Sequence, residues 1–138
     1  MNNEVKNQDV MLDLSGFAVV KTDTYVKEVL EVMTKFPFGI ACVIDEEGKL
    51  KGVFTDGDMR RLTLHRQKPW AALFVDDIMV HAFPKPTTVH ADGNLVDSIH
   101  LMEDKFIRDI PVVDEAGKLI GLLHLHPVSY THLTLPTI

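Results

Sequence analysis

The chain has 138 residues, of which 46% are hydrophobic and 25% charged, and its formal net charge is −6 at pH 7. A chain of this length is the size of one ordinary domain, and its apolar content is enough to form a core. The negative charge argues against general nucleic-acid binding, which needs a positive field, but it leaves a local phosphate site open.

The cysteine content and the apolar runs predict the cellular compartment in which the protein works. Cys42 is the single cysteine, so no disulfide can form within the chain and a reducing compartment is expected. No apolar run approaches the 18 residues of a membrane-spanning helix, and the polar N-terminus lacks the regions of a signal peptide. We therefore expect a soluble, cytoplasmic protein with no membrane or nucleic-acid partner.

The sequence contains an internal duplication. Residues 45–52 and 114–121 share six of eight amino acids at an offset of 69. The same offset relates a helical set in one half to a set in the other, namely Val26, Leu30 and Met33 to Leu95, Ile99 and Met102. Self-similarity of this kind indicates two copies of one structural unit. We predict repeat one over residues 1–68 and repeat two over residues 69–126.

Repeat one is predicted to form a strand, a helix, a two-stranded hairpin and a second helix. The lead-in element Asp9-Val10-Met11 comes first. Thr24 is predicted to cap the first helix and Asp56 the second. The apolar periodicity and the turn residues place the five elements at residues 18–20, 26–33, 40–44, 50–54 and 56–66.

Repeat two is predicted to follow the same order after its lead-in element Asp77-Ile78-Met79. Its strand, helix and hairpin are expected at residues 87–89, 92–102, 110–113 and 119–123. Each half then has an apolar sheet face that it cannot bury alone, so the two sheets are expected to pack together about a pseudo-twofold axis. The predicted class is α/β (α+β), with two β-α-β-β-α repeats and a ligand cleft between the strand exits.

The duplication ends after His126. Residues 127–138 lack helical spacing, whereas the first copy has its charged helix at the matching place. This segment resembles the translated sequencing-adapter read-through found at the ends of unrelated environmental sequences. We expect a non-native tail here, and we expect the last helix of repeat two to be missing.

The exit of the predicted strand 50–54 carries the strongest chemical signal. A helix N-terminus offers unpaired N–H groups to a phosphate, and the hydroxyl of Thr55 could donate to a phosphate oxygen. Asp58 could accept hydrogen bonds from the hydroxyls of a ribose. Simple capping is the alternative, which we expect for Asp56 but which does not readily explain Asp58. Arg60 and Arg61 are candidates for phosphate contacts, with a solvated helix face as the expected role of at least one of them.

This pattern resembles a known family. A glycine, two apolar residues, Thr or Ser, two variable residues and Asp, here Gly52 to Asp58 within a tandem repeat, look like a cystathionine-beta-synthase (CBS) domain pair, or Bateman module. The resemblance covers residues 1–126. It implies a disc-like pair that binds adenosine nucleotides or related ligands and regulates an attached enzyme or transporter. It further implies phosphate and ribose contacts from Thr55 and Asp58, and base contacts from Val19, Gly39, Ile40 and Ala41.

Residues 52–61 are similar, more narrowly, to the CBS region that follows the sugar-isomerase domain in arabinose-5-phosphate isomerases of the capsule and lipopolysaccharide type. Similar runs also occur beside sugar nucleotidyltransferases, so both parents stay open. The resemblance implies an effector such as AMP, ADP, ATP or a nucleotide sugar. Because the isomerase domain is not in this chain, we expect no enzymatic activity.

Repeat two departs from the motif at both polar positions. His124 takes the place of Thr55, and Pro127 takes the place of Asp58. We therefore expect a weaker second site, formed by His124, Thr88 and Ile110. His124 and His126 alternate on a strand, but because no third ligand accompanies them we expect no metal site.

The alternative function is an interaction module whose cleft stays empty. Apolar helix faces around Leu62, Leu64 and Trp70 would suit pairing of two modules, and a homodimer is expected under either reading. Asp58 separates the two functions, because it would matter for ligand binding and not for assembly.

Overall fold

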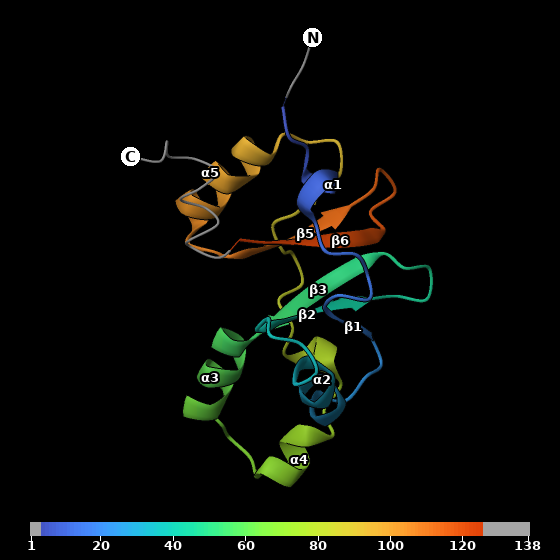
Figure 1. The fold of residues 1–138 in the computed structure, drawn as a ribbon. Coiled ribbons are helices and arrows are strands. Elements are labelled where there is room, and N and C mark those ends of the chain that lie inside the picture. The colour runs from blue at the N-terminus through green and yellow to red at the C-terminus, as the bar shows by residue number, and fades with distance from the viewer. Residues whose placement is uncertain (1–3, 126–138) are drawn as a thin grey trace.

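The computed structural model describes residues 4–125, so the predicted non-native tail lies outside the described residues. Two three-stranded sheets lie face to face in the middle of the molecule, with helices on the two outer sides (Figure 1). One sheet has the strand order β1-β2-β3 and the other the order β4-β5-β6. The expected class of two packed repeats is confirmed.

Repeat one forms all five predicted elements. They follow a short helix α1 (Asn7–Val10) and are β1 (Ala18–Lys21), α2 (Val26–Met33), β2 (Ile40–Ile44), β3 (Leu50–Thr55) and α3 (Asp56–Leu64). Strand β1 is parallel to β2, and β2 is antiparallel to β3. The cap prediction at Thr24 is wrong. Its hydroxyl accepts the N–H of Lys21 at 3.2 Å within the preceding turn, and Tyr25 occupies the cap position without a side-chain bond.

Repeat two has the same sheet and the same order of strand, helix, strand and strand, preceded by two further short helical elements. Its elements are α4 (Trp70–Phe74), a 3₁₀ turn η1 (Ile78–Val80), β4 (Val89–His90), α5 (Leu95–Lys105), β5 (Asp109–Val113) and β6 (Leu119–His124). Helix α4 was not predicted, and Pro69 stands at its cap position. Helix α5 begins and ends three residues later than predicted, because the side chain of Asn94 caps it by accepting the N–H of Asp97 at 3.1 Å.

The two sheets share a buried core. Its fully or almost fully buried side chains come from both repeats and are Phe17, Ile40, Cys42, Val53, Leu119 and Leu122. Separate apolar clusters bury α2 and α5 against the outer faces of their own sheets. Burial raises the pKa of the Cys42 thiol to about 12, so this cysteine is a core residue and not a reactive one.

The segment that leads into each repeat packs on the sheet of the other repeat. The backbone N–H of Leu12 donates to the carbonyl of Leu122 at 2.8 Å, and the N–H of Leu122 donates to the carbonyl of Leu12 at 3.0 Å. Phe83 and Val53 form the same pair of backbone hydrogen bonds. Helix α1 at the start of repeat one therefore lies beside the sheet of repeat two (Figure 1), while the segment after η1 pairs with β3 of repeat one. The packed unit is thus not the same as the sequence repeat.

The two hairpin turns define the pseudo-twofold axis. The N–H of Leu50 donates to the carbonyl of Gly117, and the N–H of Leu119 donates to the carbonyl of Gly48, each at 3.0 Å. Both glycines have a positive φ, 86° and 87°, which side chains rarely adopt. Because the two bonds are related by the offset of 69, the axis passes between the turns.

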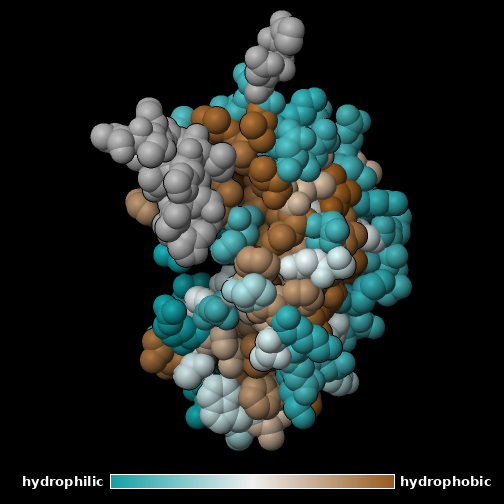
Figure 2. Space-filling view, viewed as in Figure 1, coloured by the Kyte–Doolittle hydropathy of each residue, from teal (hydrophilic) through white to brown (hydrophobic). Residues whose placement is uncertain are grey.

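The surface is mixed. Figure 2 shows apolar side chains running from the top of one face toward its centre, with hydrophilic residues along the right edge. Large apolar side chains that stay exposed near α3, α4 and η1 are Leu64, Val75 and Val80. Among the described residues, no helix combines the length and the apolar character needed to cross a membrane.

Candidate functional site

A cavity of about 270 Å³ lies where the strand exit of repeat one faces the start of β5 in repeat two. Repeat one lines it with Gly39, Ile40, Val53, Thr55, Asp56 and Gly57. Repeat two lines it with Phe83, Pro86 and Thr87 from the segment before β4. Around the start of β5 it adds Ile107, Arg108, Asp109 and Pro111. The predicted cleft between the halves is therefore present, and both halves build it.

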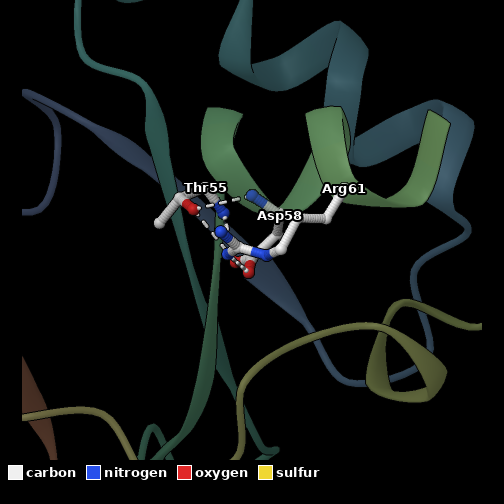
Figure 3. A network of polar contacts seen from close by, with 3 residues as sticks. All are labelled: Thr55, Asp58 and Arg61. Carbon is white, nitrogen blue, oxygen red and sulfur yellow. Dashed lines mark hydrogen bonds and ion pairs between the residues drawn. The ribbon is translucent and has the colours of Figure 1, made fainter. Parts of the chain in front are cut away.

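The first turn of α3 is held by a reciprocal capping box (Figure 3). The hydroxyl oxygen of Thr55 accepts the N–H of Asp58 at 3.1 Å, and Oδ2 of Asp58 accepts the N–H of Thr55 at 2.9 Å. The Thr55 hydroxyl also lies 3.0 Å from Oδ2 of Asp58 and donates to it. The expectation that Asp56 caps this helix is wrong. Thr55 is the cap residue, and Asp58 stands at the third helical position, where a carboxylate completes the box.

Arg61 completes the polar cluster of Figure 3. Its Nη2 lies 2.6 Å from Oδ1 of Asp58, so both oxygens of that carboxylate have partners. A Cβ placed on Gly57 would lie 3.6 Å from Nη1 of Arg61, so the guanidinium also lies over the cavity-lining first turn. Sequence reasoning left both Arg60 and Arg61 open as phosphate contacts, with a solvated helix face expected for at least one of them. In the structure Arg61 pairs with Asp58, three residues before it on the helix, whereas Arg60 is exposed on α3.

Gly39 gives the carboxylate of Asp56 its place on the cavity wall. The N–H of Asp56 donates to the carbonyl of Gly39 at 3.0 Å. A Cβ on residue 39 would overlap Oδ2 of Asp56 and lie 2.7 Å from its Cγ. The Asp56 carboxylate therefore occupies the room that the missing side chain of Gly39 leaves, and a larger residue at position 39 would displace this carboxylate.

The opposite wall carries an Asp–His pair. Nδ1 of His124 lies 2.6 Å from Oδ1 of Asp109, and the His124 ring lies 4.5 Å from the Phe38 ring. Burial raises the pKa of Asp109, while the hydrogen bond and charge of His124 act to lower it. Sequence reasoning missed Asp109 and Arg108 as cavity residues. The offset of 69 from Ile40 and Gly39 was the signal that could have found them.

The remaining predicted residues lie away from the cavity wall. Ala41 is fully buried on the α2 side of its sheet, and Val19 is half-buried against the core between the sheets. Ile110 is fully buried under α5, and Thr88 is exposed next to the cavity residue Thr87. Their roles as ligand contacts stay predictions.

Comparison with known sequences identifies close relatives. The sequence model of the CBS domain matches residues 8–65 and 75–126. The chain is 36% identical over 123 residues to the arabinose 5-phosphate isomerase KdsD of Pseudomonas aeruginosa, covering 88% of this chain and 36% of that protein. It is 31% identical over 102 residues to the arabinose 5-phosphate isomerase GutQ of Salmonella typhi, covering 74% and 30%. The chain thus spans about a third of the length of these curated relatives.

Comparison with solved structures agrees. The crystal structure of CBSX2 in complex with AMP has a TM-score of 0.78 and 30% identity, covering 94% of this chain and 96% of that chain. The CBS domain pair of MJ0100, solved with 5′-methylthioadenosine and S-adenosyl-L-methionine, has a TM-score of 0.77 at 18% identity, which supports the fold alone. Because the family model matches both repeats, the protein belongs to the CBS-domain family as a tandem pair of CBS repeats.

Proposed function

We propose that the protein is a regulatory CBS pair that senses a nucleotide, either an adenosine nucleotide or a nucleotide sugar, in the cavity between its repeats. The observation that carries the proposal is the cavity itself, where two hydroxyls, two carboxylates and one guanidinium converge on a mainly apolar wall. Small-molecule sites commonly have this composition. The AMP complex of CBSX2, at 30% identity, supports an adenosine ligand.

A phosphate of the ligand would lie at the first turn of α3. Among the described residues, no acceptor takes the N–H of Gly57, which lines the cavity. Amides at the start of a helix bind phosphate because the helix dipole adds a partial positive charge there. The hydroxyl of Thr55 and the guanidinium of Arg61 would add a hydrogen bond and a charge, and Arg60 remains the more remote candidate.

The ribose and the base would occupy the rest of the cavity. The proposed acceptors for ribose hydroxyls are the carboxylate of Asp56, which lines the cavity, and that of Asp58, which does not line it and is bonded to Thr55 and Arg61, since an ionised carboxylate can accept several hydrogen bonds. The base would lie against Gly39 and Ile40. Val19 and Ala41, which do not line the cavity, would act only by supporting the strands behind it.

The parent of this module would be a sugar-phosphate isomerase of the arabinose 5-phosphate type, because KdsD and GutQ match over most of this chain. In this proposal the chain has no catalysis of its own and works in the cytoplasm. Binding would regulate the parent only if the ligand prefers one arrangement of the module, since equal affinity for two arrangements shifts no equilibrium.

Titration calorimetry of the 138-residue chain with AMP, ADP, ATP and a cytidine sugar nucleotide tests the proposal. We expect at least one of these to bind the wild type, and we expect Asp58→Ala and Gly39→Ala to weaken binding about tenfold or more. Gly39→Ala narrows the cavity without touching the capping box. The control is Asp23→Ala, which removes an exposed carboxylate outside the cavity. No binding by folded wild type would refute the proposal.

A homodimer is part of the proposal. Leu64 near the end of α3 is 72% exposed, and Val75 and Val80 lie exposed beyond it, so this side of the module offers apolar surface. Light scattering should give twice the chain mass for the wild type and a lower mass for Leu64→Glu. A monomeric wild type would refute the homodimer and would leave the proposal of ligand binding unchanged.

A further inference from the structure

Resting on the proposed function, we propose that Asp109 makes the cavity selective against ligands with two or more phosphates, so that the effector is a nucleoside or carries a single phosphate. The inference concerns the chemical class of the ligand and not its base. It comes from the charges that face the cavity.

Three charged side chains line the cavity, namely Asp56, Arg108 and Asp109. Asp56 and Arg108 are exposed, so water and salt weaken their fields. The side chain of Asp109 is only 19% exposed. A charge on a partly desolvated wall interacts more strongly with a ligand than an exposed charge does. The field that a ligand meets at the repeat-two wall is therefore mainly that of a carboxylate.

His124 keeps this carboxylate in place. Its Nδ1 is 2.6 Å from Oδ1 of Asp109, and the Phe38 ring packs against its imidazole. The bond from Nδ1 of His124 orients the carboxylate through Oδ1, and the second oxygen, Oδ2, is not used by this bond. Burial has the largest effect on the pKa of Asp109 and raises it, the charges of His124 and Arg108 lower it, and the charge of Asp56 across the cavity raises it. Each wall therefore carries a carboxylate, with the exposed Arg108 beside that of Asp109.

The positive charge that Arg61 brings close to the first turn of α3 can neutralise only a small part of the charge of a phosphate chain. Arg61 is 67% exposed and already paired with Asp58. One phosphate could lie at the Gly57 amide and the Thr55 hydroxyl, on the repeat-one side. A longer phosphate chain inside the cavity would approach the wall of Asp109, where like charges repel.

The test is calorimetric titration of the 138-residue chain with adenosine, AMP and ATP, at low and at high salt. The wild type should bind AMP at least about tenfold more tightly than ATP, and the difference should shrink at high salt, because salt screens the repulsion. Asp109→Asn keeps an oxygen for His124 and removes the charge, so it should narrow the AMP-to-ATP ratio by about tenfold. Asp23→Asn removes one exposed carboxylate outside the cavity and should leave the ratio unchanged.

The possible failures can be told apart. If adenosine, AMP and ATP all fail to bind a wild type that melts cooperatively, adenosine sensing itself is wrong and this inference falls with it. If ATP binds as tightly as AMP in the wild type, only the charge selectivity is overturned. Should Asp109→Asn not fold, the salt series on the wild type still tests the charge repulsion, and an AMP-to-ATP ratio that does not change with salt would overturn the inference.

Discussion

The ends of β3 and β6 occupy equivalent places in the two repeats, but they present different polar side chains. In repeat one, Ile40 pairs with Thr55 across the β2–β3 hairpin, and in repeat two Asp109 pairs with His124 across β5–β6 in the same register. The hydroxyl of Thr55 turns to the helix that follows and caps it, whereas the imidazole of His124 turns to the neighbouring strand and bonds its carboxylate. One backbone therefore presents two different sets of polar groups.

The difference also decides which exit stays open. Thr55 and Ile107 line the cavity as separate walls. Their counterparts at the offset of 69 are His124 and Phe38, whose rings are in contact with centroids 4.5 Å apart. Two aromatic side chains in contact fill the space that a hydroxyl and an aliphatic side chain leave. A duplicated fold thus supports two unlike ends, and symmetry of the backbone does not imply two equal sites.

The largest expected effect concerns the two joints between the halves, where the Val53–Phe83 and Leu12–Leu122 backbone pairs connect one repeat to the other. A Cβ on Gly52 would lie 2.8 Å from the carbonyl oxygen of Phe83, and a Cβ on Gly121 would lie 2.8 Å from that of Leu12. Because backbone cannot move away cheaply, Gly52→Ala and Gly121→Ala should each lower the free energy of unfolding by about 1–3 kcal/mol. Urea denaturation of both variants measures this.

The matched control for these joints is Gly16→Ala, whose added Cβ meets its nearest atoms at an ordinary 3.4 Å and should cost less than about 0.5 kcal/mol. Similar losses at the two joints would show that the halves differ only at their strand exits. A loss at one joint alone would break the comparison.

A smaller effect is expected from the capping box of α3. Asp58→Ala removes both the hydrogen bond to the Thr55 amide and the charge near the helix start, so it should cost about 1 kcal/mol. Asp58→Asn keeps an acceptor oxygen and should lose about half as much. Thermal melts followed by circular dichroism distinguish the two. Equal losses would mean that the charge, and its pair with Arg61, matters more than the hydrogen bond.

The smallest effects come from pH, where two Asp–His pairs should act in opposite directions. The hydrogen bond from Lys68, and then that from His81, lowers the pKa of Asp76. A lowered pKa contributes stability above the unfolded value, and this stability is lost as pH falls through the folded pKa. Asp76→Asn should therefore make the melting temperature fall less steeply on acidification to about pH 3.

The pKa shift of Asp109 acts on stability in the opposite direction to that of Asp76. Burial raises its folded pKa, so its ionised form opposes folding as pH rises above the unfolded value of about 3.9. Asp109→Asn should leave the melting temperature at neutral pH unchanged or higher, since the amide oxygen can still accept from His124. A clear drop at neutral pH would show that the ion pair with His124 outweighs the cost of burial.

Local patterns in the sequence determined the duplication, the order of the elements and the family. The apolar spacing of Val26, Val29 and Met33 predicts α2 because a helix that packs on a sheet must bury one face. The predicted strands of both hairpins end within one residue of their observed bounds. Thr55 and Asp56 could be proposed as site residues in the same way, because they stand where a strand ends and a helix begins, whereas Gly39 and Ile40 came from the family resemblance.

Tertiary structure alone decided the exchange of the lead-in segments and the composition of the far wall. The pairing of Leu12 with Leu122 joins residues 110 positions apart, and such a contact leaves no trace in local periodicity. Asp109 and Arg108 stand at the offset of 69 from Ile40 and Gly39, but only packing brings them to the cavity beside Thr55. Hydrophobic spacing records which face of an element is buried, whereas the partner of that face depends on how the two halves pack.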